Sequence, residues 1–229
     1  MGTLYVIATP IGNLGDISFR AIETLKILDV LLCEDTRVTH RLLERYGLKL
    51  PLESYREQVH GKTLTRIVER LKQGQSIGLA SDAGTPGISD PGTWLVNDLL
   101  RLAPETEMIP IPGPTAAIAA LSVAGFPTEE FVFLGFPPHK KGRAAFFRKA
   151  LAEPRTTVIY ESTHRIVKAL TAIAESAPNR RLCLARELTK IHETLYRGTA
   201  AEILTAMPAD QIRGEFVLVL SAEKKRVDV

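Results

Sequence analysis

Short runs of apolar, often β-branched residues alternate with segments of helical period along the first half of the chain. The runs at 4–8, 30–33, 77–80 and 108–111 are typical of buried strands. Between them, apolar residues recur every three or four positions and predict helices, with Ser18 and Thr36 placed where helix-capping residues are favoured. This alternation predicts an α/β domain built on a mainly parallel sheet.

The alternation becomes looser after a connection at 124–130. Strands are expected at 131–134, 157–160, 182–185, 193–197 and 216–220, and helices at 143–151 and 166–173. Because strands outnumber helices here, we expect a mixed sheet. We therefore expect two α/β domains, residues 1–124 and 125–229.

Composition excludes several classes of protein. The chain has 229 residues, of which 45% are apolar and 24% charged, as in an ordinary globular protein. Its longest apolar stretch, 116–126, is far below the roughly 20 residues of a membrane span, and the N-terminus shows no secretory pattern. Cys33 and Cys183 lie inside apolar runs, which favours buried thiols in a cytoplasmic protein, and their spacing predicts no metal site.

The net charge of +3 conceals an uneven distribution. Residues 1–120 carry 12 basic and 14 acidic side chains, whereas residues 121–229 carry 17 and 12. A basic cluster in the second half is opposed only by Glu153. Either a polyanion-binding patch or a solvated helix face explains this cluster. Its members are His139, Lys140, Lys141, Arg143, Arg148, Lys149 and Arg155.

Three loops rich in glycine and proline follow predicted strands, at 9–16, 81–92 and 110–116. In open α/β sheets, ligands bind at the carboxyl ends of the strands, where these loops must lie. Asp82 can accept hydrogen bonds there, and the glycines let the backbone approach a ligand. None of the loops carries the glycine pattern of a dinucleotide or triphosphate site, so nicotinamide cofactors and nucleoside triphosphates are disfavoured.

Runs that place acids beside bases start near three other strand ends, at 34–37, 160–165 and 185–190. They predict either buried ion pairs that organise a cleft or groups that act on a substrate. No arrangement of Ser, Cys and His indicates a covalent nucleophile.

Five of these segments together carry a specific resemblance. The runs TPIGNL at 9–14 with DIS at 16–18, EDTR at 34–37, 81–92, PGP at 112–114 and RELTK at 186–190 closely resemble small-subunit ribosomal RNA methyltransferases. That family belongs to the tetrapyrrole-methylase-like superfamily, and the matches run in order from about residue 4 to 221. The resemblance implies two α/β domains that hold S-adenosylmethionine between them, a homodimer, and 2′-O-methylation of a cytidine in the decoding region of 16S rRNA within the small ribosomal subunit.

Positions carried over from the family predict the donor site. The residues implied are Pro10, Asp82, Gly84, Thr85, Thr115, Ala116, Tyr160, Ala185 and Gly214. The chain departs from the family at two places. The run SYREQVH at 54–60 replaces one that resembles His-Asn-Glu, and Thr163 stands where proline is usual.

Proton transfer and RNA contact define two further sets of candidates. A base that assists the transfer is expected among Glu34, Asp35, Glu187 and Lys190, although Lys190 requires a lowered pKa to serve. RNA contacts are expected from Arg37, Lys140, Lys141, Arg143, Arg165 and Arg186. Two alternatives remain open: a small-molecule methyltransferase acting on a tetrapyrrole, and a non-catalytic RNA-binding module.

Overall fold

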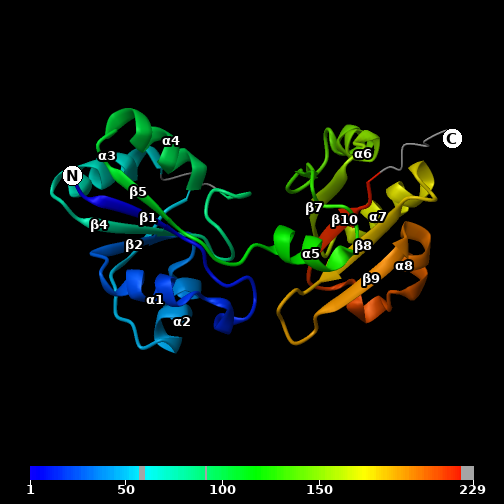
Figure 1. Ribbon diagram of the computed structural model, residues 1–229, viewed down its shortest axis with the longest axis horizontal. Helices are drawn as coiled ribbons and strands as arrows, with labels where there is room; N and C mark the ends of the chain where they lie inside the picture. The colour runs from blue at the N-terminus through cyan, green and yellow to red at the C-terminus, as the bar shows by residue number, and fades with distance from the viewer. Residues whose placement is uncertain (57–59, 91, 223–229) are drawn as a thin grey trace. The chain divides into compact units, whose positions relative to one another are not determined.

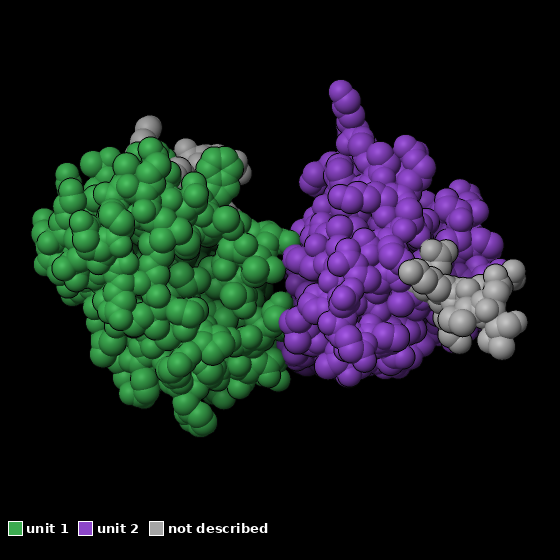
Figure 2. Space-filling model, turned by 45° about the horizontal axis from the view of Figure 1, so that its top comes forward, with its two compact units in different colours: residues 1–115 green, residues 116–229 purple. Residues whose placement is uncertain are grey.

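The computed structural model describes residues 1–56, 60–90 and 92–222 (Figure 1). The chain divides into two compact units, Met1–Thr115 and Ala116–Val229, which Figure 2 distinguishes by colour. Each unit has its own sheet and its own hydrophobic core.

The sheet of the first unit is entirely parallel. Its strands lie in the order β3-β2-β4-β1-β5, and every neighbouring pair runs in the same direction. This confirms the fold class expected from the alternating pattern. The hydrophobic pattern delimits no strand at β3, which is short and has no buried residue. The strands are β1 (Thr3–Ile7), β2 (Val30–Cys33), β3 (Leu52–Ser54), β4 (Ser76–Ala80) and β5 (Glu107–Ile111).

Helices cover both faces of this sheet (Figure 1). On one face, α1 (Phe19–Lys26) and α2 (Thr36–Arg45) bury apolar residues against the strands, and on the other α3 (His60–Lys72) and α4 (Gly92–Leu102) do so. A short 3-10 helix, η1 (Leu14–Asp16), precedes α1.

The two expected helix caps have different outcomes. Ser18 caps α1, because its hydroxyl oxygen accepts a hydrogen bond from the N–H of Ala21 at 3.1 Å. Asp35 caps α2 in place of the expected Thr36, which is the first helical residue.

The order of strands in the first unit explains why its loops lie together. β1 is paired with β4 on one side and with β5 on the other. The chain therefore leaves three adjacent parallel strands at the same edge of the sheet. In doubly wound sheets, this is the edge at which ligands bind.

The sheet of the second unit is mixed, as the sequence predicts. Its strand order is β6-β7-β10-β8-β9, in which only β6 and β7 are parallel neighbours. Of its antiparallel pairs, β8 and β9 are consecutive strands, whereas β10 pairs with β7 and β8, which come much earlier in the chain. The strands are β6 (Phe131–Phe133), β7 (Thr156–Ser162), β8 (Arg181–Arg186), β9 (Thr194–Thr199) and β10 (Glu215–Leu220).

Three helices pack on one face of this second sheet and one helix on the other. α6 (Arg143–Ala152), α7 (Ile166–Ser176) and α8 (Ala200–Ala206) share a core on the first face. The expected elements do not include α8, whose start is fixed by a capping box between Thr199 and Glu202. A 3-10 helix, η3 (Ala209–Ile212), leads into β10.

The helix on the opposite face determines where the units divide. α5 (Ala116–Ala124) buries Ala117 and Ala120 against β7, β8 and β10. Because α5 packs on the second sheet, the division falls between Thr115 and Ala116, nine residues before the boundary expected from the sequence. Among the described residues, no helix is long and apolar enough to cross a membrane.

Candidate functional site

The loop that follows β4 is fastened to the end of β1. The N–H of Thr9 donates to the carbonyl of Gly84 at 2.9 Å, and the N–H of Gly84 donates back at 3.1 Å. The hydroxyl of Thr9 also donates to the carbonyl of Ser81 at 3.0 Å. Gly84 has a φ of 86°, a conformation that favours glycine. The turn is thus fixed in shape before any ligand arrives.

The loop after β5 lies against the same turn. The hydroxyl of Thr85 donates to the carbonyl of Pro114 at 3.4 Å. A Cβ atom on Gly113 would lie 2.9 Å from the Cβ of Ala8, so glycine permits this close approach. Five residues predicted for the donor site therefore belong to three adjoining loops of the first unit: Pro10, Asp82, Gly84, Thr85 and Thr115.

Asp90, which is not among the residues predicted for the site, holds the far part of the loop after β4. One of its carboxylate oxygens accepts from the N–H of Gly87 at 2.6 Å and from the N–H of Gly92 at 2.8 Å. Ser89, next to it, has a φ of 66°. An aspartate between glycines in a turn was the available signal, since its side chain readily bonds nearby backbone N–H groups.

Three acidic residues adjoin where β2 and β4 end. The N–H of Asp35 donates to Oδ1 of Asp82 at 2.9 Å, and the N–H of Asp82 donates to Oε1 of Glu34 at 3.4 Å. Asp82 is exposed, and within the described part of the chain its Oδ2 has no hydrogen-bond partner. Asp82 can therefore accept hydrogen bonds from a ligand at this edge.

Asp35 is already fully engaged. Its carboxylate caps α2 through the N–H of Arg37 at 2.9 Å, and it accepts from the Arg37 guanidinium at 3.0 and 2.6 Å. These hydrogen bonds from Arg37 hold the pKa of Asp35 well below its usual range. The Arg37 side chain is 84% exposed, so it bonds Asp35 at the surface of the unit.

Glu34 differs from its neighbour. Partial burial raises the pKa of the Glu34 carboxyl and outweighs the hydrogen bond from the Asp82 N–H, which lowers it; the negative charges of Asp82 and Asp90 add to the increase. Its carbonyl accepts from Nε of Arg56 at 2.8 Å and from the hydroxyl of Ser54 at 3.3 Å, so two residues of the divergent 54–60 run support the backbone here. Residues 57–59 of that run lie outside the described residues.

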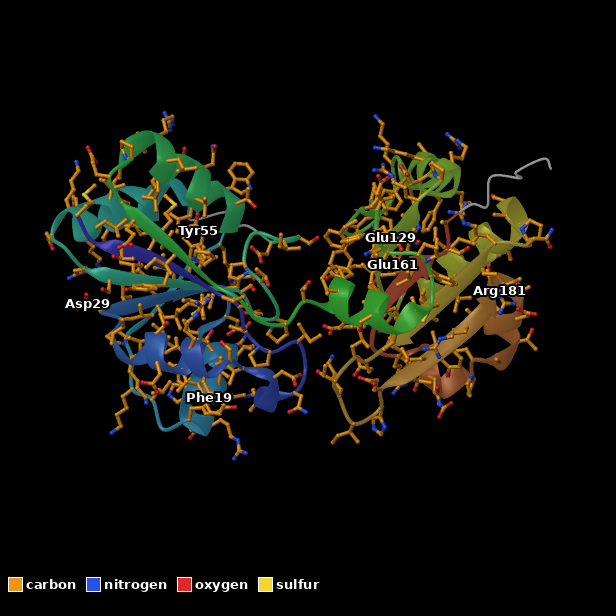
Figure 3. The ribbon with its side chains drawn as sticks, in the orientation of Figure 1. Phe19, Asp29, Tyr55, Glu129, Glu161 and Arg181 are labelled. Carbon is orange, nitrogen blue, oxygen red and sulfur yellow. The ribbon has the colours of Figure 1, made fainter. Side chains whose placement is uncertain are left out.

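The Glu34 side chain lines a small recess of the first unit. The buried ring of Tyr55, labelled in Figure 3, also contributes, and burial raises the pKa of its hydroxyl to about 12. The recess is lined by Glu34, Tyr55, Leu79, Ala80, Ser81, Pro86, Asp90 and Gly92.

In the second unit, three of the four predicted donor residues lie on the face that α5 covers. The hydroxyl oxygen of Tyr160 accepts from the N–H of Ala117 at 3.1 Å, at the start of α5, where Ala116 is the first residue. Tyr160 and Ala185 are both register partners of Val217 in β10, so they share a face of the sheet. The ring of Tyr160 also contacts Phe136 edge to face, with centroids 5.3 Å apart.

Gly214, the fourth of these residues, lies just before β10 and close to Glu187. A Cβ atom on Gly214 would lie 2.7 Å from the Glu187 side chain. Its N–H donates to the hydroxyl oxygen of Thr163 at 2.8 Å, and that hydroxyl donates to the Gly214 carbonyl at 2.5 Å. Thr163 thus links the end of β7 to the start of β10.

Glu187 and Lys190 neutralise one another. Nζ of Lys190 lies 3.0 Å from Glu187 and 2.9 Å from Glu215. Burial opposes the charge on Lys190, but its hydrogen bonds to the two carboxylates prevail and its pKa is raised. The lowered pKa that Lys190 would need as a base is therefore not found. The pKa of Glu187 is lowered: burial opposes this shift, but hydrogen bonds from the Glu215 N–H and Lys190 outweigh it.

The six predicted RNA contacts separate into two groups. Arg37, Lys140 and Lys141 are exposed. Arg186 is buried and donates to the carbonyls of Arg213 at 2.8 Å and His192 at 2.9 Å. Arg143 and Arg165 are directed at the buried carboxylate of Glu161. Within this unit, the last three side chains are thus used to hold protein groups.

The chain combines a parallel sheet, which has three adjoining loops at the ends of its strands, with a mixed sheet. This combination can be compared with known families. Residues 3–204 match the family model described as Tetrapyrrole (Corrin/Porphyrin) Methylases. The solved structure of the methyltransferase CobJ has the same fold, with a TM-score of 0.70 at 19% identity and coverage of 97% of this chain and 95% of that one. The chain belongs to the tetrapyrrole methylase family, whose members use S-adenosylmethionine as methyl donor.

The chain is similar to several proteins named ribosomal RNA small subunit methyltransferase I. Ribosomal RNA small subunit methyltransferase I of Neisseria meningitidis serogroup A is 46% identical over 96% of this chain and 76% of that protein. The protein of the same name from Thermotoga maritima is 40% identical over 98% of this chain and 100% of its own length. That from Bacillus subtilis is 43% identical over 96% of this chain and 75% of its length.

The residues of the first unit fit S-adenosylmethionine. Asp82 presents a carboxylate oxygen of the kind that binds ribose hydroxyls or an ammonium group, and the turn at Gly84 brings backbone within reach of a ligand. Among the described residues, no cluster of His, Cys, Asp and Glu could hold a metal ion. The donor set thus suits an organic cation with a ribose.

Proposed function

We propose that this protein transfers a methyl group from S-adenosylmethionine to the 2′-hydroxyl of a cytidine in the decoding region of 16S rRNA. The observation that carries the proposal is the identity of 40–46% with ribosomal RNA small subunit methyltransferases over at least 96% of the chain. The strand-end carboxylates of the first unit and the exposed lysines of the second support it. From the same likeness, we propose that the protein acts as a homodimer on the small ribosomal subunit in the cytoplasm.

Asp82 and the turn at Gly84 supply the donor-binding part of the site. In this proposal, Asp82 accepts hydrogen bonds from the donor, while the hydrogen bonds between Thr9 and Gly84 keep the loop in its binding shape. S-adenosylmethionine supplies a methyl group on a positively charged sulfur, which is strongly electrophilic. The protein therefore contributes chiefly by holding the acceptor oxygen in line.

Glu34 is the group we propose as the proton acceptor. Of the four candidates, Asp35 is held by Arg37, and Glu187 and Lys190 are held by one another. Glu34 has no ion pair among the described residues, and burial raises the pKa of its carboxyl. A carboxylate with a raised pKa is a stronger base, so Glu34 can accept the 2′-hydroxyl proton as the oxygen attacks.

Lys140 and Lys141 are the proposed contacts to the RNA backbone, together with Arg37. These side chains are exposed, and no described residue forms a salt bridge with either lysine. Binding to phosphates releases counterions, so affinity is expected to fall as salt increases. Access to a single ribose also requires the target nucleotide to be unpaired or displaced from its helix.

A transfer assay tests the proposed substrate class. The protein is incubated with labelled S-adenosylmethionine and either unmethylated small ribosomal subunits, free 16S rRNA or a porphyrin-type acid, and transferred label is counted. We expect label on the RNA, with the Asp82→Ala variant inactive at limiting donor. Label on the porphyrin acid alone would identify a small-molecule methyltransferase, and donor-independent RNA binding without transfer would identify an RNA-binding module.

A further inference from the structure

A fully buried carboxylate lies in β7 of the second unit. The side chain of Glu161, labelled in Figure 3, has 0% of its surface exposed. Its Oε2 accepts from Nη2 of Arg143 at 2.5 Å, and its Oε1 accepts from the N–H of Ser162 at 2.8 Å and lies 3.1 Å from Nε of Arg165. Two arginines thus surround one acid, and we call these three residues the Glu161 cluster.

The Glu161 cluster holds a loop at both of its ends. Nη1 of Arg165 donates to the carbonyl of the buried Pro137 at 3.1 Å, where the loop begins. At the other end, the N–H of Arg143 donates to the carbonyl of Lys140 at 3.3 Å, across a turn in which Gly142 has a φ of 87°. Residues 138–142 between these two points are all exposed, and the basic ones among them are His139, Lys140 and Lys141.

The arginines of the cluster are poorly placed to bind a phosphate themselves. Their side chains are only 18% and 15% exposed, for Arg143 and Arg165 respectively. Nη2 of Arg143 is used by Glu161, and its Nη1 is buried without a hydrogen-bond partner in the described part of the chain. The Arg143 guanidinium also lies over the ring of Phe147, 5.0 Å from its centroid.

We propose that Glu161 is a positioning residue for RNA binding: with Arg143 and Arg165 it fixes the 137–143 loop so that Lys140 and Lys141 meet neighbouring phosphates. The two arginines act through this loop and do not bind phosphate. The inference rests on the proposed RNA substrate. In this proposal, the buried Glu161 carboxylate holds the exposed lysines in place for RNA binding.

The direction in which Glu161→Gln changes RNA affinity distinguishes this positioning role from a purely electrostatic effect. Glu161→Gln removes a negative charge from beside a cationic surface, so a purely electrostatic effect would tighten RNA binding. If the carboxylate positions the loop, the same change weakens binding, because the lysines lose their fixed spacing. A general loss of structure would weaken donor binding as well.

The experiment measures binding of 16S rRNA at several KCl concentrations, together with donor binding by calorimetry. We expect Lys140→Ala with Lys141→Ala to reduce the salt slope by about 2. Glu161→Gln is expected to weaken RNA binding about fivefold and to reduce the slope in the same direction, with donor affinity unchanged. Adding Glu161→Gln to the double lysine variant should cause little further loss, since the lysines it positions are gone.

Two outcomes would overturn the proposal: RNA binding by Glu161→Gln that equals or exceeds that of the unchanged protein, or losses that add in the triple variant. Arg165→Gln serves if Glu161→Gln does not fold, and it should behave in the same way. Limited trypsin digestion after Lys140 and Lys141 tests the loop without RNA. We expect faster cleavage in either variant. Unchanged cleavage would show that the Glu161 cluster does not fix the 137–143 loop, and this result does not depend on the proposed RNA substrate.

Discussion

Two strand-end runs of similar composition behave in opposite ways in this protein. In the first unit, the Glu34 carboxylate forms no ion pair with a described residue, since Arg37 bonds Asp35 and Arg56 donates to the Glu34 backbone carbonyl. In the second unit, Glu161 of the run at 160–165 pairs with Arg165 of the same run and with Arg143 of α6. An acid near an arginine in the sequence thus indicates either a reactive group or a structural ion pair, and the neighbours supplied by distant segments determine which.

The largest expected effect comes from Glu34, the acid that forms no ion pair with a described residue. Glu34→Gln should reduce the rate of methyl transfer by about 100-fold or more, because general base catalysis typically contributes that much. Donor affinity should change less than twofold. Single-turnover transfer to small subunits and calorimetry of donor binding give the two numbers.

The pH dependence of the rate sharpens this test. Because the pKa of Glu34 is raised above its ordinary value of 4.5, the rate should increase with pH as this carboxyl loses its proton above that value. Glu34→Gln should lack this step. A variant that keeps the acidic limb would assign the base to another residue.

The enclosed acid should affect folding more strongly than any surface acid. Glu161→Gln leaves two partly buried arginines without their buried carboxylate and should lower the free energy of unfolding by about 3 kcal/mol, measured by urea denaturation. Glu153→Gln is the matched control, since Glu153 also pairs with an arginine but at the surface, and it should cause no measurable change. Equal effects would mean that burial does not distinguish the two pairs.

Asp82 lies between these extremes, because it is exposed yet placed to bind the donor. Asp82→Ala should raise the dissociation constant for S-adenosylmethionine by about 10- to 100-fold, as expected for a lost hydrogen bond to a charged group. Glu44→Ala, which removes an exposed acid from α2, serves as the control and should leave the constant unchanged. Equal constants for Asp82→Ala and the unchanged protein would place the donor elsewhere.

The smallest effect is expected from Glu187, which is paired but partly exposed. Its pKa is lowered in the folded protein, so its contribution to stability is present above the ordinary value of 4.5 and is lost as the pH falls through the lowered pKa. The difference in unfolding free energy between the unchanged protein and Glu187→Gln should therefore shrink on acidification. A difference that is constant with pH would show that the carboxylate charge is not what stabilises this turn.

The fold follows from the sequence where the elements are long and periodic. The alternation of apolar runs and helical spacing predicts both sheets, whereas β3 has no buried residue and leaves no such pattern. For α8 a signal existed, the pairing of Thr199 with Glu202, but its apolar stripe is short. The two units divide nine residues before the expected boundary. Because almost all residues of α5 are apolar, the sequence alone does not show which sheet this helix covers.

The candidate site was predictable only at the level of loops. Glycine and proline mark the three loops of the first unit, and their meeting follows from the parallel strand order. The sequence did not predict the roles of Arg143 and Arg165. Both arginines pair with Glu161, but Arg143 comes from a segment 18 residues earlier in the chain, and the sequence does not show that the two meet. Sequence alone shows a basic cluster, and the structure separates the exposed Lys140 and Lys141 from the partly buried Arg143.

Identification of the methylated nucleoside tests the central claim most directly. Small subunits labelled by this protein with S-adenosylmethionine are digested to nucleosides, and the product is analysed by mass spectrometry. We expect 2′-O-methylcytidine from a single position of the decoding region, and its loss with Glu34→Gln. A methyl group on a base, or no methylated nucleoside at all, would contradict it.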